Sequence, residues 1–524
     1  KGSGSDYATE AAKAGEFQKM ASLNANIDAI FNGHTHQVYA WDAPIPGQPG
    51  KTRPILQTGE YAANVGQIQL SVDPDTKAVT YTAKNVARAS AADLTNTTVK
   101  AVDDIVKAAL AKAAEVGNQP VGKLTADITR AYNGVDSAGK PVEDRGAEST
   151  LGDLVANALR DGIPADIAKP DIGIVNPGGL RADLTYAGAT TDNPANTDGV
   201  LTYAEANNVL PFVNNIWTVE LTGAELEQVL EQQWQPTGAS RPYLHLGLSD
   251  NVEVTQDPTQ PAGSRITSVR INDEWLDDAK VYKVSTFSFL GTGGDNFTAF
   301  KEGTSKDTGL VDRDLWVKYL KEHTVSPDFA RQQVIAEDLP KRFTAGSRVR
   351  VKLSKLDLTS VGSPANTKVE VVRVRGDKRQ VLKSVPITAG AVRVKFTVPG
   401  ADSVELVAQP SGTTLTRDVR RSKPKIQSVK VFPKSIKAGK TKARIKVTVR
   451  APNDGRVEGT VRFSVGGRKY FADLTKIKGQ ARSKAVVRLA SIKKPGKYKL
   501  EARFTGNSQY RSVREEITLR VRRH

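Results

Sequence analysis

The sequence contains no cysteine among its 524 residues, which excludes disulfide bonds and thiol chemistry. It also lacks any run of about 18 apolar residues, so no segment is a candidate for a membrane-spanning helix. Apolar residues make up 39% and charged residues 25% of the chain, the composition of a globular rather than a disordered protein. A chain of this length has room for three or four domains of ordinary size.

A signal peptide is not recognisable either, and the chain opens with the loop-like stretch Lys-Gly-Ser-Gly-Ser. The absence of structural cysteines suits a protein that bacteria export. We therefore expect a secreted or cell-surface bacterial protein whose signal segment lies upstream of Lys1.

Acidic and basic residues are distributed unevenly along the chain. Residues 341–524 contain 46 Lys and Arg against 12 Asp and Glu, a net charge of +34, whereas residues 1–340 carry a net charge of −16. The basic part predicts a partner with an acidic surface, such as an anionic cell-wall polymer, membrane headgroups or nucleic acid. A solvated strand surface rich in cations is the alternative interpretation.

The first 93 residues have the mixed pattern of an α/β fold. Residues 94–118 follow as a predicted helical connector between two domains. The predicted elements are a helix over 10–24, strands over 27–31, 55–57, 64–72 and 78–86, and a connecting helix over 99–116. An Asp-Pro-Asp-Thr turn that begins at Asp73 joins the last two strands.

Residues 119–340 repeat the α/β pattern and carry clear signals for helix starts. Thr222 with Glu225, and Thr202 with Glu205, form the capping-box pattern, in which each side chain bonds the other residue's backbone N–H. A helix is predicted over 151–159 and ends before Gly162. Strands are predicted over 172–176, 217–221, 266–271 and 282–286.

From about Arg342 the pattern changes to short strands with alternating apolar and polar residues, separated by turn residues about every ten positions. This periodicity is typical of all-β sandwiches, and its length suits two modules, over 341–421 and 422–524. We expect immunoglobulin-like sandwiches without a catalytic site, since the only histidine in this part is His524.

Two of the five histidines lie one residue apart in Gly33-His34-Thr35-His36, directly after a predicted strand. In an extended loop, residues i and i+2 point to the same side, so both imidazoles could be aimed at one metal ion. Imidazole suits Zn, Mn and related ions. Two ligands are too few for a tight site, and a polar turn is the alternative interpretation.

Two glycine-rich turns in the second block suggest a ligand site. The strand before Asn176 runs into Asn-Pro-Gly-Gly-Leu-Arg181, where glycines let the backbone approach a ligand and the Arg fork suits phosphate or carboxylate. The stretch Phe-Leu-Gly-Thr-Gly-Gly-Asp-Asn-Phe from Phe289 to Phe297 combines an aromatic ring, a glycine pair and Asp295.

These stretches, with "RGAESTLGDLVANAL", "LTYAEANNVLPF" and "LTGAEL", occur in an order that resembles the C-terminal substrate domain of the 5'-nucleotidase family. That family includes UDP-sugar hydrolases and 2',3'-cyclic nucleotide phosphodiesterases. The Gly-His-Thr-His segment resembles the last metal-ligand motif of its calcineurin-like metallophosphoesterase domain. The resemblance implies a partial metallophosphoesterase sandwich over 1–93 and an α/β 5'-nucleotidase C-terminal domain over 119–340.

The resemblance also implies roles for individual residues. Phe212 and Phe289 would stack on the nucleobase, and Asp295 would accept hydrogen bonds from the ribose hydroxyls. The remaining implied contacts are Asn176 and Asn214 at the base edge or at neighbouring polar groups, and Arg145 and Arg181 at phosphate or a carboxyl-like edge. For each Phe alone, core packing is the alternative.

His34 and His36 would each bind one of two divalent metal ions, Zn, Mn or similar, in the full-length parent. The family's other motifs, Asp-x-His, Gly-Asp and Gly-Asn-His-Glu, do not occur before Gly33 in this sequence. The histidine–aspartate pair that the family uses in catalysis is therefore expected upstream of Lys1. We expect the parent to release phosphate from nucleotides and the present chain to be inactive alone.

Three other functions stay open at this stage. The second block could bind nucleosides without catalysis, and the basic modules could anchor the protein to a surface. Nucleic-acid binding by the basic part is disfavoured, because stacking on bases needs exposed aromatic residues and this part has few.

Overall fold

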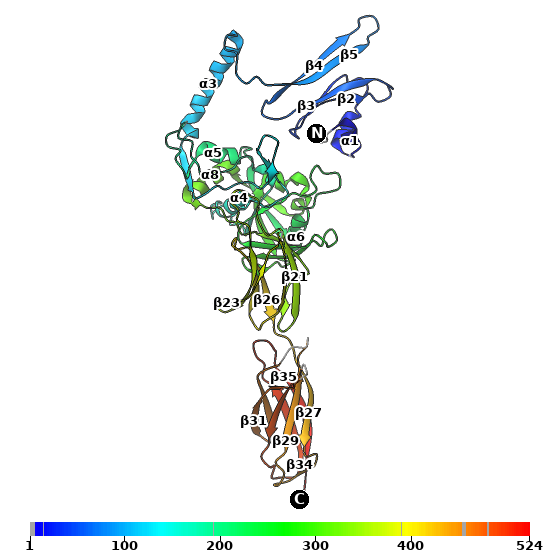
Figure 1. Cartoon of the computed structure of the whole chain (residues 1–524), viewed down its shortest axis with the longest axis vertical. Helices are drawn as coiled ribbons and strands as arrows, with labels where there is room; N and C mark the ends of the chain where they lie inside the picture. Colours follow the sequence, from blue (N-terminus) through cyan, green and yellow to red (C-terminus); the bar gives the residue numbers. More distant parts are fainter. Residues whose placement is uncertain are drawn as a thin grey trace. The chain divides into compact units, whose positions relative to one another are not determined.

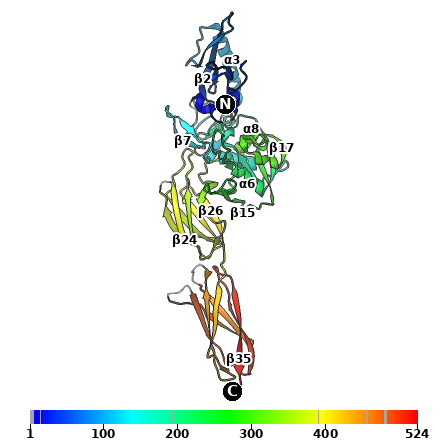
Figure 2. The same cartoon turned by 90° about the vertical axis from the view of Figure 1, so that its right-hand side faces the viewer.

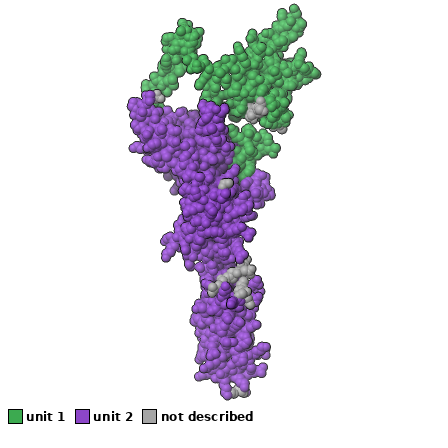
Figure 3. Space-filling view, in the orientation of Figure 1, with its two compact units in different colours: residues 1–119, 234–243 green, residues 120–233, 244–524 purple. Residues whose placement is uncertain are grey.

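The computed structural model of the protein describes residues 6–13, 15–191, 193–388, 390–452, 457–478 and 482–523. The opening stretch 1–5 and His524 lie outside the described residues. The chain divides into two compact units, Lys1–Gln119 with Trp234–Tyr243, and Pro120–Gln233 with Leu244–His524 (Figure 3).

The first unit contains a small three-stranded sheet covered by two short helices. These elements are α1 (Tyr7–Ala11), α2 (Glu16–Ala21), β1 (Ile30–Phe31), β2 (Val38–Pro44) and β3 (Thr52–Thr58), with strand order β1-β3-β2. The prediction of one helix over 10–24 is wrong. Gly15 is the N-cap of α2, and glycine, with its large conformational freedom, disfavours a continuous helix.

A hairpin and one long helix complete this part of the first unit. β4 (Asn64–Val72) and β5 (Val79–Ala87) pair antiparallel, and Asp73 Oδ1 accepts the N–H groups of Asp75 and Thr76 in the turn, as predicted. The predicted helix over 99–116 is also confirmed as α3 (Thr97–Gly117), which Asn96 caps. None of its residues is buried.

The second unit begins with a mixed α/β arrangement, in which Figure 1 labels α4, α5, α6 and α8. Its central sheet has five strands in the order β12-β9-β16-β11-β17. Its strands are β9 (Ile172–Val175), β11 (Asn215–Thr222), β12 (Gly247–Leu248), β16 (Val281–Phe287) and β17 (Thr304–Val311). The helices are α4 (Thr150–Asp161), α5 (Tyr203–Val209), α6 (Gly223–Glu231), α7 (Ser288–Gly291) and α8 (Asp312–Glu322). Both predicted capping boxes, at Thr202 and at Thr222, are present.

Short strands and 3-10 turns surround this sheet. The small strands are β6 (Pro120–Leu124), β7 (Tyr132–Val135), β8 (Pro141–Glu143), β10 (Val200–Thr202) and β18 (Thr324–Val325). Two 3-10 turns lie within the glycine-rich stretches, η1 (Pro177–Gly179) and η2 (Gly294–Asn296), and a third, η3 (Thr298–Glu302), comes after the second stretch. The core between sheet and helices includes Leu151, Val175, Leu201 and Trp316.

A six-stranded sheet of order β15-β14-β13-β19-β21-β24 runs across residue 340. Its strands are β13 (Val252–Gln256), β14 (Ile266–Ile271), β15 (Glu274–Trp275), β19 (Gln333–Glu337), β21 (Arg348–Ser354) and β24 (Ala391–Thr397). It packs on a second sheet of β20 (Phe343–Thr344), β22 (Lys368–Arg375), β23 (Lys378–Pro386), β25 (Ser403–Gln409) and β26 (Thr414–Arg420). The predicted boundary at 340 therefore falls between two strands of one sheet.

The last part is a sandwich of two sheets around a core that includes Ile445, Phe463 and Phe504 (Figure 2). One sheet contains β27 (Lys425–Phe432), β29 (Arg444–Arg450), β33 (Arg482–Arg488) and β32 (Thr475–Lys476). The other contains β28 (Ile436–Lys437), β35 (Val513–Arg522), β34 (Gly496–Phe504), β30 (Thr460–Val465) and β31 (Arg468–Asp473). Sandwich architecture was predicted here, and the immunoglobulin-like topology stays a prediction.

Candidate functional site

The turn after β9 holds a buried asparagine with one unused acceptor. Asn176 is 3% exposed, and its Nδ2 donates to Asp295 Oδ2 at 2.8 Å. Its Oδ1 is buried and has no hydrogen-bond partner among the described residues. Because buried polar atoms are nearly always paired, this oxygen marks a position where a ligand could supply the missing donor.

Asp295 is held in a left-handed backbone conformation, with φ 51° and ψ 30°, inside η2. Gly293, two residues earlier at the N-cap of η2, has φ 81°, a value that glycine adopts without strain. Left-handed residues other than glycine are costly and cluster at functional sites. The tight turn directs the Asp295 carboxylate at Asn176, 119 residues away in the sequence.

Arg145 joins these two residues around Gly178. A methyl group added at Gly178 would lie 3.3 Å from Asn176 Nδ2, 3.4 Å from Asp295 Oδ2 and 3.5 Å from Arg145 Nη1. The absence of a side chain at Gly178 thus leaves space that faces all three groups. Arg145 Nε lies 3.1 Å from Glu143 Oε1, which orients the guanidinium. We call Arg145, Asn176 and Asp295 the polar cluster.

A second group of charges, which the sequence did not single out, supports the polar cluster through Glu143. Arg130 Nη1 lies 3.8 Å from Glu143 Oε1, and Arg130 Nε donates to Asp183 Oδ1 at 3.0 Å. Burial alone would raise the pKa of Asp183, but hydrogen bonds from Arg130 and Tyr132 outweigh it and hold that pKa below its ordinary value. Burial and the bond to Asp183 raise the pKa of Tyr132 to about 12.

The two phenylalanines expected to stack on a base are exposed rather than packed in the core. Phe212 is 56% exposed and Phe289 is 43% exposed. The Arg181 guanidinium lies 5.7 Å from the centroid of the Phe212 ring. The Phe289 ring lies against Gly294, where an added methyl group would come within 2.6 Å of it, so this ring is next to Asp295 in the fold.

Asn214 is engaged with a buried acid. Its backbone N–H and its Nδ2 both donate to Asp312 Oδ2, at 3.0 and 2.9 Å, and Asp312 is 1% exposed at the start of α8. Asn214 therefore fixes the end of α8 to the chain before β11. Sequence reasoning did not identify Asp312 as its partner.

The histidine loop is tightly turned, so the prediction of an extended loop is wrong. His34 has φ 80° and His36 has φ 60°. Thr35, between them, is fixed by Gln57, whose Oε1 accepts from Thr35 N at 3.1 Å and from Thr35 Oγ1 at 3.0 Å. His36 Nδ1 contacts the carboxylate of Glu60.

Metal binding requires more than this pair of imidazoles. Within the ranges that the structure describes, no group of three or more His, Cys, Asp or Glu side chains is placed to hold a metal ion. The described residues around His34 and His36 thus do not complete a metal centre.

A cluster of buried ionisable groups lies around His245 and Glu148. His245 is buried beside Arg331, and burial, with the nearby guanidinium, lowers its pKa to about 3. Arg331 Nη2 pairs with Glu148 Oε2 at 3.1 Å, and Glu148 is fully buried. Burial also raises the pKa of Asp153 well above its ordinary value, with a further contribution from the charge of Glu148.

Residues 120–302 match the family described as 5'-nucleotidase, C-terminal domain. This match confirms, for residues 120–302, the resemblance to the 5'-nucleotidase family noted in the sequence. The curated relatives include 5'-nucleotidases and a nucleotide phosphoesterase.

Three relatives illustrate the range of these matches. The cell wall protein Lmo0130 of Listeria monocytogenes is 26% identical over 425 residues, which cover 76% of this chain and 50% of that protein. The trifunctional nucleotide phosphoesterase YfkN of Bacillus subtilis is 27% identical, covering 59% of this chain and 20% of that protein. The snake venom 5'-nucleotidase of Macrovipera lebetinus is 26% identical, covering 58% and 76%.

The chain spans half or less of the length of the Listeria and Bacillus proteins. Among solved structures, a 5'-nucleotidase precursor from Thermus thermophilus is 23% identical with a TM-score of 0.42, covering 60% of this chain and 61% of that chain. No helix in the described part of the chain is long and apolar enough to cross a membrane.

Proposed function

We propose that the chain is part of a nucleotide phosphohydrolase of the 5'-nucleotidase type and that its polar cluster binds the nucleoside. The observation that carries the proposal is the convergence of Arg145, Asn176 and Asp295 on Gly178, beside the exposed ring of Phe289. Three segments far apart in the sequence meet there within the domain that the family match covers.

The residues of this site are assigned roles by their chemistry. The rings of Phe212 and Phe289 stack on the base, an interaction worth about 1–3 kcal/mol per base. Asp295 accepts from the ribose hydroxyls, and the unused Asn176 Oδ1 accepts from the base edge. Arg145 and Arg181 hold phosphate or another anionic edge. Because Asn214 donates to Asp312, we assign it a supporting role.

His34 and His36 are proposed as two ligands of a dimetal centre whose other ligands lie outside the described residues. Two divalent ions such as Zn or Mn supply an activated water and a clamp on the phosphoryl oxygens when bound. The strained left-handed conformations of both histidines support a functional rather than a purely structural loop. UDP-sugars and 2',3'-cyclic nucleotides are further candidate substrates.

Nucleoside binding by this chain tests the first half of the proposal. We expect Asp295→Asn to weaken adenosine binding by about 10- to 100-fold, because a hydrogen bond to a charged group is worth about 1.5–3 kcal/mol. Asparagine tolerates the left-handed conformation, so the fold is retained. Isothermal titration calorimetry measures the affinity, and the exposed Asp314→Asn on α8 is the charge-matched control. Equal affinities of the Asp295 variant and the wild type would contradict the assignment.

Phosphate release from AMP tests the second half. With Mn or Zn added, we expect no turnover by the 524-residue chain, because its described residues do not complete a metal-binding group. A chain extended at the N-terminus by the segment that contains Asp-x-His, Gly-Asp and Gly-Asn-His-Glu is expected to turn over, and His34→Asn with His36→Asn is expected to reduce that turnover by at least about 100-fold. Robust activity of the short chain would refute the metal assignment.

A binding module without catalysis is the rival function. It predicts that the extended chain binds adenosine with the Asp295 dependence given above but releases no phosphate. The location proposed for either function is the bacterial cell surface, which the similarity to a cell wall protein and the basic residues 341–524 support. Attachment to an anionic wall polymer is part of this proposal.

A further inference from the structure

The four-stranded sheet of the last sandwich presents an outward face on which the charged residues of its strands β29 and β33 are all cations. Alternate residues of β29 and β33 enter the core, including Ile445, Val447 and Ala485. Their neighbours along the strands therefore point outward. We define the basic face as the outward residues Lys430, Arg444, Lys446, Arg482, Lys484 and Arg488.

Like charges lie directly opposite each other on this face. Lys430 pairs across the strands with Lys446, and Arg444 pairs with Arg488. Like charges in directly opposed positions destabilise a sheet. Among the residues with described positions, no acid forms an ion pair with any of the six. The fold thus maintains a repulsive arrangement that an anionic partner would relieve.

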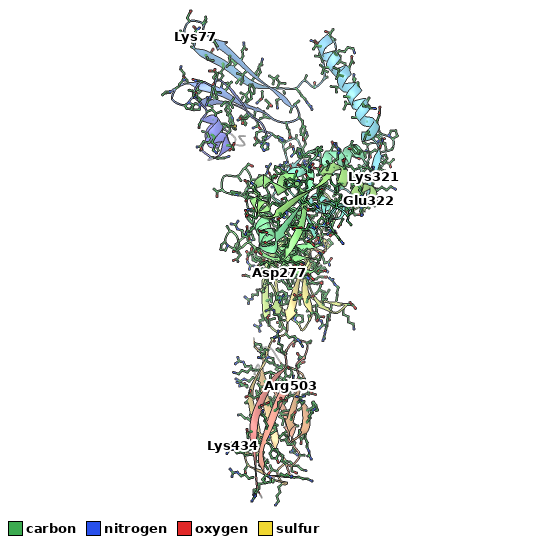
Figure 4. The ribbon with its side chains drawn as sticks, turned by 180° about the vertical axis from the view of Figure 1, so that it is seen from behind. Lys77, Asp277, Lys321, Glu322, Lys434 and Arg503 are labelled. Atoms are coloured by element: carbon green, nitrogen blue, oxygen red, sulfur yellow. The ribbon has the colours of Figure 1, made fainter. Side chains whose placement is uncertain are left out.

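The opposite sheet of the same sandwich is a natural comparison, because there acids accompany the cations. Glu501 lies 3.0 Å from Arg462 and 3.9 Å from Arg514, and Glu516 pairs with Lys499 at 2.5 Å. Arg503, labelled in Figure 4, belongs to this second sheet. Directly opposed cations occur on this second sheet as well, for example Lys497 opposite Arg520. The basic face differs in that no acid among the described residues pairs with its six cations, and this lack of compensating charge requires a separate explanation.

We propose that the basic face binds a linear phosphodiester polymer without bases, of the polyol-phosphate type found at bacterial surfaces. Cations recur about every 6.6 Å along a strand and about every 4.8 Å across strands, so a flexible chain of phosphates can contact several at once. This inference deepens the proposed attachment to a wall polymer and is independent of nucleotide hydrolysis.

The composition of the face favours this ligand over nucleic acid and lipid. Single-stranded nucleic acids are bound by exposed aromatic side chains on which bases stack. The strands of this face provide one aromatic residue, Phe432, and the Arg444 guanidinium lies 5.8 Å from its ring centroid. Insertion into a lipid surface needs a larger apolar patch. On β27, β29 and β33 the large apolar side chains that are exposed are Phe432 and Val486.

Binding of fluorescent poly(glycerol phosphate) to the full chain tests the proposal. We expect the variant Lys430→Gln/Lys446→Gln/Lys484→Gln to bind at least about 10-fold more weakly at low ionic strength. The slope of log K against log salt should fall by about 2, since each phosphate contact contributes roughly 0.7 for a single-stranded polyanion. The matched control Lys469→Gln/Lys497→Gln/Arg520→Gln, on the other sheet, should change affinity less than about 2-fold.

Folding is checked separately in the same variants. Removing like-charge repulsion should leave the melting temperature of the Gln variant unchanged or higher, and replacement of the three lysines by arginine should retain binding. Equal loss of affinity in test and control variants would overturn the proposal. The proposal would also be overturned if an oligo(dT) of equal charge, or vesicles with anionic headgroups, bound as tightly as the polymer does. Adenosine affinity should be the same in all these variants, which separates this proposal from the nucleoside site.

Discussion

Replacement of Arg417 by methionine is expected to lower the free energy of unfolding by about 3–5 kcal/mol, the cost of leaving a buried charge without its partner. Arg417 on β26 is 1% exposed and its side chain donates to Glu253 Oε1 at 2.9 Å, Thr255 Oγ1 at 2.6 Å and Ser268 Oγ at 2.9 Å. It also donates to Pro340 O at 3.2 Å. These contacts join β26 in one sheet of the first β-sandwich to β13 and β14 in the other.

The loss should depend on pH, because Glu253 remains behind. Burial already raises the pKa of Glu253, against the opposing charge of Arg417. Without Arg417 the folded-state pKa rises further, so the folded state holds a proton that the unfolded state releases, and stability falls as pH increases. We therefore expect a larger deficit at about pH 8 than at about pH 5, measured as hydrogen-exchange protection of β13 and β26.

Two further variants separate the buried charge from other effects. Arg417→Met with Glu253→Gln should recover much of the lost stability, because the orphaned carboxylate is removed. Arg342→Met should cost less than about 1 kcal/mol, since Arg342 is largely exposed and lies 3.9 Å from Asp418. A loss of unfolding free energy below about 1 kcal/mol for Arg417→Met, or a loss independent of pH, would show that the contacts of Arg417 with β13 and β14 contribute little to stability.

The sequence predicted features that short-range patterns determine. The capping boxes at Thr202 and Thr222 and the turn at Asp73 each depend on residues within three positions of one another. Alternation likewise identified the strands of the basic part. The conformations of His34 and His36 were not predictable in this way, because Gln57, 22 residues after Thr35, holds that loop.

Long-range pairings escaped the sequence for the same physical reason. β13 pairs in parallel with β19, bringing Val254 opposite Gln333, and β19 in turn pairs with β21, which carries the sheet across residue 340. Arg417 has the sequence context of a solvated strand cation, yet it is buried against the acidic part of the chain. The contact between Asn176 and Asp295 was suggested only by resemblance to a family, since no local pattern relates residues 119 positions apart.

Replacement of Gly173 by alanine is expected to destabilise the second unit by about 3 kcal/mol, the upper end of the cost of overpacking a core. Gly173 lies on β9 under helix α4, and a methyl group there would lie 1.9 Å from the carbonyl oxygen of Ala156 and 3.1 Å from Arg160 N. Both are backbone atoms, so relief requires the whole helix to move away from the strand.

That displacement should also reach the nucleoside site, because β9 continues directly into Asn176. We expect Gly173→Ala to lower both the urea midpoint and adenosine affinity, the latter about tenfold. Gly178→Ala is the matched control: its methyl group meets side-chain tips at 3.3 to 3.5 Å, so stability should change by less than about 1 kcal/mol while the space facing the polar cluster is filled. If Gly178→Ala bound adenosine as the wild type does, the ligand would not occupy that space, and the convergence of Arg145, Asn176 and Asp295 would be structural.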